Sequence, residues 1–328
     1  MWAKQKQTGF TIVELLIVIV VIGILAAITI VAYNGIQGRA VVASLQSDLT
    51  NGSQQVKLFQ VDNSSYPTTI DCTQPDSATN KCLKASSATT YQYLVSNTSP
   101  QTFCLAATKN SQSYSVRQNG LILAGNCPLL YLDASDMASY PGSGTTWTDL
   151  SGNGNSGTLN GGVGYSGLNS GALTFDGVGT YVSSLTSQNY LDVTIVFQPD
   201  FSLNNATSIA GILATGLGTD ESLRFGNING VGPWNLSNPG NINDWALTST
   251  SYMINGNVSN NVVSGWNILS GYRTNQTSFP PNFAYFLGSG YAGRYYKGKI
   301  AAVLMFNRQL SDSDHQQIFN ALRGRYGI

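Results

Sequence analysis

Residues able to perform acid–base catalysis are few in this chain. Among its 328 residues are one histidine, His315, and two glutamates, Glu14 and Glu221. Hydrolysis of a glycoside needs two carboxylates roughly 5–10 Å apart, and the strand acid nearest to Glu221 is an isolated Asp192. A Ser–His–Asp arrangement would need His315, which we expect on the outer face of a C-terminal helix. The sequence therefore predicts a protein that is not an enzyme.

The four cysteines, Cys72, Cys82, Cys104 and Cys127, lie close together in the sequence. An even, clustered count favours two disulfides in an oxidising compartment, although four cysteines allow three connectivities. We favour Cys72–Cys82 and Cys104–Cys127, because each pair closes a local loop. A zinc site is the alternative, but no Cys-x-x-Cys pair and no nearby histidine supports it.

Oxygen-bearing side chains gather in two loops that could bind calcium, which takes six to eight oxygen ligands. Asp149 with Asn153 and Asn155 form the first candidate, and Asp220 with Glu221 form the second. Asx side chains and glycines also satisfy tight backbone turns, so we prefer a turn for the first loop and surface charge for the second. The expected cofactor is none, with Ca²⁺ as the alternative.

The segment NINGVGPWNLSNPGNINDW (227–245) places Trp234 and Trp245 in a loop rich in asparagine and glycine, with Asp244 adjacent. Sugar recognition uses exposed aromatic rings beside amide and hydroxyl donors. A tryptophan in a structured loop is more often a packing anchor, yet two in one loop make this the best candidate for ligand binding. Trp147 and Trp266 lie in strand-like contexts and are expected in the core.

Glu14 lies at the edge of a segment with no other charge, LLIVIVVIGILAAITIVA (15–32). This segment approaches the ~20 apolar residues that span a hydrocarbon core as a helix. Lys4 and Lys6 precede it, which places residues 1–9 on the cytoplasmic side. A carboxylate buried there without a partner costs several kcal/mol. Glu14 therefore either reaches the interface or pairs with a positive charge on a partner.

The string GFTIVELLIVIVVIGILAA resembles the type III signal of type IV pilins and pseudopilins. The resemblance covers about the first 60 residues. It implies that a prepilin peptidase cuts after Gly9, that Phe10 becomes the N-methylated first residue, and that Glu14 pairs with a neighbouring subunit's α-amino group. Residues 1–9 are then a leader peptide, and the subunit sits in the membrane before it enters an extracellular filament on the cell surface.

A single helix is expected over residues 10–62. Beyond the apolar segment, Leu45, Leu49, Val56 and Phe59 recur at spacings of four, seven and three, which predicts one buried stripe. Many family members have a helix-bending proline where this chain has Val31, so we expect a straighter helix, with any softening at the glycines Gly35 and Gly38.

Residues 63–127 predict a small antiparallel meander, the globular head that the pilin resemblance implies. Three β-like runs, at 90–95, 102–108 and 113–118, are separated by turn residues, and LILAG follows them. The tyrosines Tyr91, Tyr93 and Tyr114 are interpreted as packing residues.

Residues 128–328 predict an all-β jelly-roll sandwich. They contain 28 of the 35 glycines, and short apolar strands recur between turns, which marks a change of domain near Pro128. A closing helix is expected, with Ser311 and Asp314 as its capping box and Ile318, Phe319 and Leu322 facing the core.

Strings in this region, among them LDASD, GALTFDGVGTYVSS and YKGKIAAVLMFNRQLSDSDHQQIFNALRGRYG, resemble the laminin-G-like branch of the concanavalin A-like sandwich. That resemblance implies binding of carbohydrate or protein, sometimes through calcium; fold analogy alone does not assign the ligand.

The sequence as a whole predicts an α+β pilin followed by a concanavalin A-like sandwich with a short C-terminal helix. We expect a filament subunit that displays a lectin-like domain for adhesion. Its expected partners are other pilin subunits, the prepilin peptidase, the membrane and a glycan or surface protein. The alternatives are a pseudopilin of a secretion or DNA-uptake system and a structural pilin whose sandwich binds nothing. Lysine plus arginine equals aspartate plus glutamate, so no nucleic acid is expected as a partner.

Overall fold

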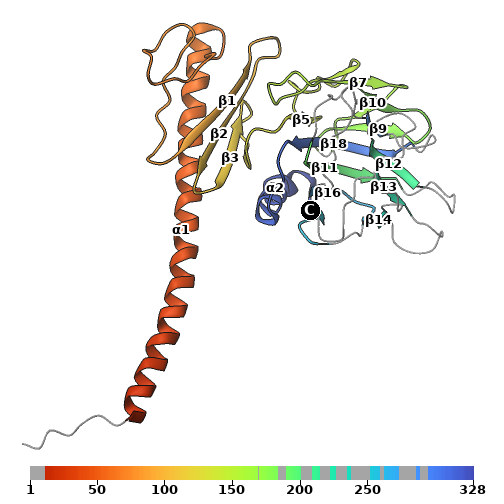
Figure 1. The fold of residues 1–328 in the computed structure, drawn as a ribbon. Helices are drawn as coiled ribbons and strands as arrows, with labels where there is room; N and C mark the ends of the chain where they lie inside the picture. Colours follow the sequence, from red (N-terminus) through yellow and green to blue (C-terminus); the bar gives the residue numbers. More distant parts are fainter. Residues whose placement is uncertain are drawn as a thin grey trace, which may run out of the picture.

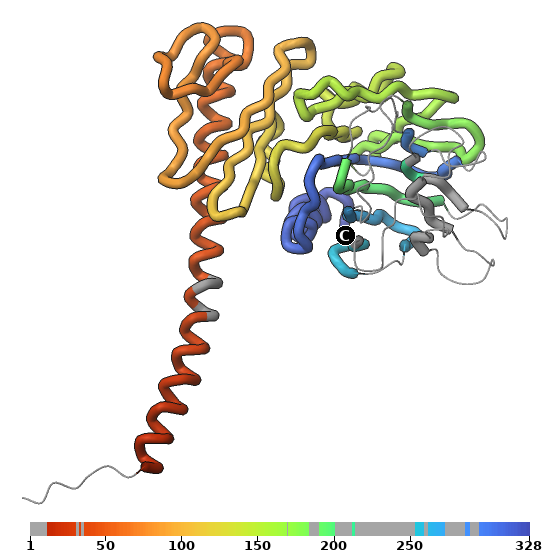
Figure 2. Tube along the Cα trace, in the orientation of Figure 1, coloured from red at the N-terminus to blue at the C-terminus, as the bar shows by residue number. Residues whose placement is uncertain are grey.

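The structure is a computed structural model that describes residues 12–168, 170–183, 190–200, 209–214, 222–226, 235–237, 252–258, 262–272, 286–288 and 295–328. It consists of a long helix, a four-stranded sheet packed on one half of that helix, and a two-sheet sandwich beside the four-stranded sheet (Figure 1). Figure 2 follows the chain from the helix through the four-stranded sheet into the sandwich. This architecture confirms the predicted fold class.

Helix α1 (Ile12–Asn63) is one continuous helix of 52 residues, about 78 Å long at 1.5 Å per residue. Its first half extends away from the rest of the molecule (Figure 1), and the apolar side chains there are exposed. Among the described residues, Ile12–Ile30 is the one stretch whose length and mean hydropathy of 3.0 suit a membrane span. The second half buries the predicted stripe: Leu45, Leu49, Val56 and Phe59.

Four antiparallel strands form the predicted meander in the order β1-β2-β3-β4. They are β1 (Thr90–Ser96), β2 (Thr102–Lys109), β3 (Gln112–Arg117) and β4 (Ile122–Ala124). This sheet packs on α1, and Gly52 permits the approach, since a Cβ there would lie 2.7 Å from Leu105 Cδ2. We call this sheet, with the helix stripe on which it packs, the head.

The sandwich is built from two mostly antiparallel sheets. The outer sheet has the order β14-β13-β12-β17-β10-β7-β6, and the inner sheet has the order β15-β16-β11-β18-β9-β8, with β5 paired to β18. The bounds are β5 (Leu130–Asp133), β6 (Thr146–Trp147), β7 (Gly157–Asn160), β8 (Gly164–Ser166), β9 (Ala172–Asp176), β10 (Tyr181–Ser183), β11 (Asp192–Pro199), β12 (Ile209–Ala214), β13 (Ser222–Gly226), β14 (Asn235–Ser237), β15 (Tyr252–Ile254), β16 (Asn267–Tyr272), β17 (Phe286–Leu287) and β18 (Lys297–Phe306).

The two sheets enclose the first hydrophobic core. The outer sheet contributes Trp147, Val182 and Leu287, and the inner sheet contributes Phe175 and Ile195. All are nearly or fully buried. Trp147 is thus in the core, as predicted, and so is Trp266 at 8% exposure.

A second hydrophobic core crosses the predicted domain boundary at residues 127 and 128. Side chains alternate along a strand, so Val196 of β11 points out of the sandwich, while its neighbour Ile195 points in. Val196 joins Phe306 of β18, Leu123 of β4 and Leu322 of helix α2 (Asp312–Tyr326) in one buried cluster. In Figure 1, α2 lies between the head and the sandwich. The head and the inner sheet therefore share a core.

A buried charge lies at the same junction. Arg117 of β3 is fully buried, and its guanidinium carbon lies 4.3 Å from the centre of the Tyr131 ring on β5. Burial lowers the pKa of Arg117 to about 10, opposed by the charges of Tyr131, Asp149 and Asp133. The guanidinium nevertheless stays protonated at neutral pH, so a cation–π contact joins the head to the sandwich.

Candidate functional site

The N-terminal candidates surround the start of α1. Gly9 and Phe10 lie outside the described residues. Glu14 lies in the first turn of α1, and its side chain is exposed. An acid in the first turn interacts favourably with the positive end of the helix dipole. Glu14 thus lies at the beginning of the apolar stretch, on a helix whose first half is covered by no other described element of the subunit.

Both favoured disulfides are formed. Cys72–Cys82 closes a loop beside the outer end of α1, and Cys104–Cys127 connects β2 to the segment that enters the sandwich. No free cysteine occurs in the described part of the chain, which contains all four. The second bridge covalently fixes the start of the sandwich to the head, next to their shared core.

Asp149, one of the three candidate calcium ligands, is nearly buried and occupied by loop hydrogen bonds. Its carboxylate accepts the N–H groups of Tyr131, Ser151 and Asn155 at 2.9–3.0 Å, and burial raises its pKa against these bonds. Asn153 and Asn155 donate their side-chain amides to the Leu129 carbonyl oxygen at 3.2 and 2.9 Å. Such hydrogen bonds from side chains to the backbone are those of a tight turn. The amide nitrogens of Asn153 and Asn155, rather than their oxygens, face the Leu129 carbonyl.

The described residues contain no group of three or more His, Cys, Asp or Glu side chains arranged to hold a metal ion. The second calcium candidate, Asp220 with Glu221, lies outside the described residues. So do Trp234, Asp244 and Trp245, the candidate ligand-binding residues, which remain predictions.

The expected position of His315 on an outer helix face is wrong. His315 is 1% exposed, and its Nε2 lies 2.9 Å from Oδ2 of Asp192, which is fully buried. Asp192 also accepts the Leu310 N–H at 3.0 Å. Burial raises the pKa of Asp192, and the hydrogen bond from His315 opposes that rise. The pair anchors α2 to β11 and, at this burial, is closed to a substrate.

The spacing of α2 contained the signal for this burial. His315 precedes Ile318, Phe319 and Leu322 by three, four and seven residues, so it lies on the same helix face. We expected a polar imidazole to be exposed. A buried histidine needs a hydrogen-bond partner, and the sequence does not show a partner that is distant along the chain.

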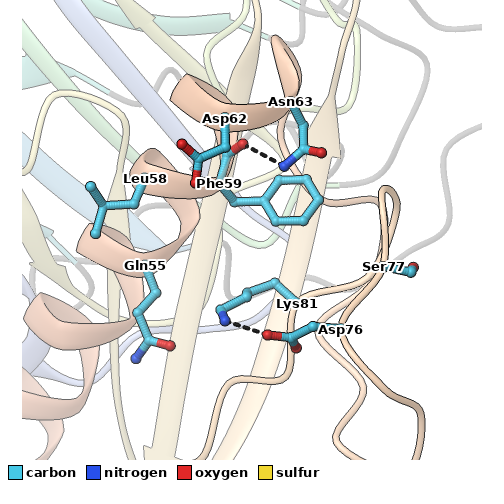
Figure 3. Close-up of a pocket in the computed structure, with 8 residues that line it drawn as sticks. All are labelled: Gln55, Leu58, Phe59, Asp62, Asn63, Asp76, Ser77 and Lys81. Atoms are coloured by element: carbon cyan, nitrogen blue, oxygen red, sulfur yellow. Dashed lines mark hydrogen bonds and ion pairs between the residues drawn. The ribbon is translucent and has the colours of Figure 1, made fainter.

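A groove of about 500 Å³ lies at the outer end of α1 (Figure 3). Its walls come from α1 and from the loop closed by Cys72–Cys82: Gln55, Leu58, Phe59, Asp62, Asn63, Asp76, Ser77 and Lys81. Asp76 pairs with Lys81 and also accepts the Cys82 N–H at 2.8 Å. The Asp76 carboxylate is therefore already paired within the wall of the groove.

An aromatic cluster on the outer sheet was missed at the sequence level. Tyr181, Phe286 and Tyr295 are partly exposed, and the Tyr181 ring contacts both of the others. The alternation of Tyr181, Val182 and Ser183 shows that one face of this strand is apolar, but three residues do not show which strand lies beside it.

Comparison with known proteins identifies the N-terminal segment. Residues 4–30 match the family described as the prokaryotic N-terminal methylation motif. The Type II secretion system core protein G of Escherichia coli K12 is 36% identical over 69 residues, which are 21% of this chain and 48% of that protein. The same protein of Dickeya chrysanthemi is 35% identical over 66 residues, 20% of this chain and 43% of that protein.

The chain spans less than half the length of these curated relatives. The N-terminal segment is therefore type IV pilin-like, as predicted, and the matches leave the sandwich unaddressed. Solved structures similar in shape include domain 4 of AbnA, an extracellular arabinanase from Geobacillus stearothermophilus, at 16% identity and a TM-score of 0.34, covering 58% of this chain and 97% of that one. At that score the likeness carries no argument about the sandwich.

Proposed function

We propose that this chain is a type IV pilin-like subunit that builds a surface filament and displays its sandwich for recognition. A prepilin peptidase would remove residues 1–9 after Gly9, and Phe10 would be N-methylated. The observation that carries the proposal is the methylation motif at residues 4–30, followed directly by the exposed apolar half of α1. That half spans the membrane before assembly and is covered by neighbouring helices afterwards.

Glu14 has a specific role in this proposal. Cleavage after Gly9 makes Phe10 the first residue of the mature chain, with a free α-ammonium group, and Glu14 the fifth residue. In the apolar interior of a filament, the Glu14 carboxylate would be costly without a cation. A neighbouring subunit's α-ammonium group supplies that cation, so the pair sets the stagger between subunits.

The sandwich is proposed as a recognition domain with no catalytic role. Filament assembly uses α1 and the head, whereas no described side chain of the outer sheet belongs to the core shared with the head. The shared core fixes the sandwich against the head, so each subunit would present the outer sheet in one orientation. That arrangement suits binding to a surface, with a glycan or a surface protein as the ligand.

A second candidate is a pseudopilin of a secretion system. The matched relatives are Type II secretion system core proteins, and they support this alternative about equally. A pseudopilin would act inside the envelope, whereas an adhesive pilin must reach the exterior. Gold-labelled antibody against the sandwich separates the two: labelled filaments outside intact cells support the adhesive pilin, and label confined to the envelope supports the pseudopilin.

Two substitutions test the filament role. We expect Gly9→Ala to reduce leader removal, seen as a slower-migrating precursor on a gel. We expect Glu14→Ala to be cleaved normally but to lose filaments in electron micrographs, because the α-ammonium group then lacks its carboxylate. Asp312→Ala, a change at an exposed carboxylate of α2, is the control and should leave both steps intact. Normal filaments from Glu14→Ala would refute the charge pair.

A further inference from the structure

The outer sheet carries a cluster of partly exposed aromatic side chains with polar neighbours on the same face. We propose that this cluster is a binding platform for a neutral glycan, an inference that rests on the proposed recognition function of the sandwich. The platform consists of Tyr181, Phe286 and Tyr295 with Asn160 and Ser183, all within the described residues.

Strand alternation places these side chains on the outward face. On β7, β10 and β17 the residues Leu159, Val182 and Leu287 are buried in the core between the sheets. Their sequence neighbours, among them Asn160, Tyr181 and Phe286, therefore point away from that core. The second core, which the sandwich shares with the head, takes its described sandwich residues from the inner sheet, the loops and α2, and none from this face of the outer sheet.

Register brings the platform residues side by side. Tyr181 of β10 pairs with Asn160 of β7, and Val182 pairs with Leu287 of β17. In an antiparallel pair the next residue along, Ser183, lies opposite Phe286. Two rows of outward side chains result, one containing Asn160 and Tyr181 and the other containing Ser183 and Phe286.

The aromatic rings form one connected apolar surface. The ring centre of Tyr181 lies 5.9 Å from that of Phe286 and 6.4 Å from that of Tyr295, with interplanar angles of 51° and 31°. Aromatic contacts hold such rings in position. The rings are thus ordered before a ligand arrives, which lowers the entropic cost of binding.

Polar groups beside the rings have hydrogen-bonding capacity left for a ligand. The Asn160 amide donates to Ser183 Oγ at 2.9 Å and to the Thr158 carbonyl oxygen at 2.8 Å. This fixes the amide, with its nitrogen held by atoms of the sheet itself. Within the described residues, the Asn160 side-chain oxygen and the Ser183 hydroxyl proton make no other hydrogen bond. One acceptor and one donor thus adjoin the aromatic surface.

The combination suits a sugar better than other ligands. A pyranose ring has an apolar face of C–H groups that stacks on aromatic rings, and hydroxyls at its edge that bond amide and hydroxyl groups. Strands β6, β7, β10 and β17 contain no charged residue. The five platform residues are uncharged as well, so the chemistry of the described residues favours a neutral saccharide.

The test uses the full chain in detergent micelles on an array of neutral, sialylated and sulfated oligosaccharides. We expect binding to neutral saccharides, and about a tenfold weaker affinity for Tyr181→Ala and for Tyr295→Ala, since each removes one stacking ring. Tyr181→Phe keeps the ring and should retain affinity. Tyr165→Ala, at a tyrosine of β8 that is 38% exposed, is the matched control and should bind as wild type.

The possible results separate the platform from the proposed function. If Tyr181→Ala and Tyr295→Ala bind as wild type while Trp234→Ala with Trp245→Ala does not, recognition stands and the platform is refuted. If the wild-type chain prefers sialylated or sulfated saccharides, the neutral class is wrong. If it binds no saccharide, the glycan platform is overturned, whereas filament assembly is judged separately by the Gly9 and Glu14 variants.

Discussion

At the scale of single residues, Asp176 shows how one carboxylate holds a turn of the sandwich. Its Oδ1 accepts the N–H groups of Val178, Gly179 and Thr180 at 2.8–3.2 Å and the Thr180 hydroxyl at 2.8 Å. Desolvation acts to raise the pKa of this exposed aspartate, but the hydrogen bonds outweigh it and lower the pKa to about 2. The ionised form is thus the one that stabilises the turn between β9 and β10.

The substitution Asp176→Asn should reveal this contribution through its pH dependence. An unfolded aspartate titrates near 3.9, so the unfolded chain binds more protons between about pH 4 and pH 2. The stabilisation is therefore complete above about pH 4 and is lost as the pH falls through 2. Asparagine keeps an acceptor oxygen, so the loss at pH 7 should be only about 0.5–1 kcal/mol, allowing for solvent screening.

Thermal unfolding of the detergent-solubilised chain, followed by circular dichroism from pH 7 to pH 2, measures this difference. The gap between wild type and Asp176→Asn should narrow below pH 4. Asp62→Asn, which changes an exposed carboxylate on α1, should show no such narrowing. A gap that stays constant down to pH 2 would mean that the charge of Asp176 does not stabilise the turn.

Sequence reasoning succeeded at residues whose role is local. The methylation motif at residues 4–30 and the two short-loop disulfides depend on nearby positions, so the sequence pattern was enough to predict them. It failed at His315, because the partner of that histidine, Asp192, lies 123 residues away. Arg117 was missed for the same reason, since only the folded junction places it over Tyr131.

At the scale of elements, α2 begins with the capping box that the sequence predicted. The Asp314 N–H donates to Ser311 Oγ at 3.2 Å, and the Ser311 N–H donates to Asp314 Oδ2 at 3.1 Å. The helix ends at Gly327, which has φ 70° and donates its N–H to the Arg323 carbonyl oxygen. Because α2 covers the inner sheet beside the head, its start affects the shared core.

Removing the cap with Ser311→Ala should destabilise the protein by about 1 kcal/mol, because the N–H of Asp314 loses its acceptor. Denaturation in urea measures the change. Ser313→Ala alters an exposed serine two residues later and should change stability by much less. Equal effects of the two substitutions would contradict a specific role for the cap.

The elements themselves were more predictable than their pairing. Helical spacing predicted α1 and α2, and short β-like runs predicted β1 to β4, because these patterns depend on neighbouring residues. The position of β17 between β12 and β10 could not be predicted. A strand of two residues is too short for its side-chain pattern to define a pairing register, and its partner strands come from distant parts of the chain.

At the scale of the whole molecule, the domain boundary suggested by composition is not a boundary in the packing of the hydrophobic core. The glycine-rich composition begins near Pro128, but the second core includes side chains from both sides of that position. Composition reflects where turns are frequent, whereas a core depends on which surfaces meet in space. The sandwich is consequently fixed to the head and is no appendage on a flexible linker.

This continuity predicts that the sandwich depends on the head for its stability. In a fragment of residues 128–328, the side chains of Phe306 and Leu310 lose the backbone at Gly125, from which a Cβ would lie 3.7 and 3.3 Å away. Each is nearly buried in the chain, and exposing such a side chain costs about 1.5–3 kcal/mol. The fragment should therefore melt at a lower temperature than a fragment of residues 39–328, which retains the buried stripe of α1. It should also self-associate through the face that the head no longer covers.

Differential scanning calorimetry and size-exclusion chromatography compare the two fragments. A monomeric 128–328 fragment that melts with the longer one would show that the sandwich is stable without the head. A lower melting temperature with self-association would show that the head stabilises the sandwich through their shared core.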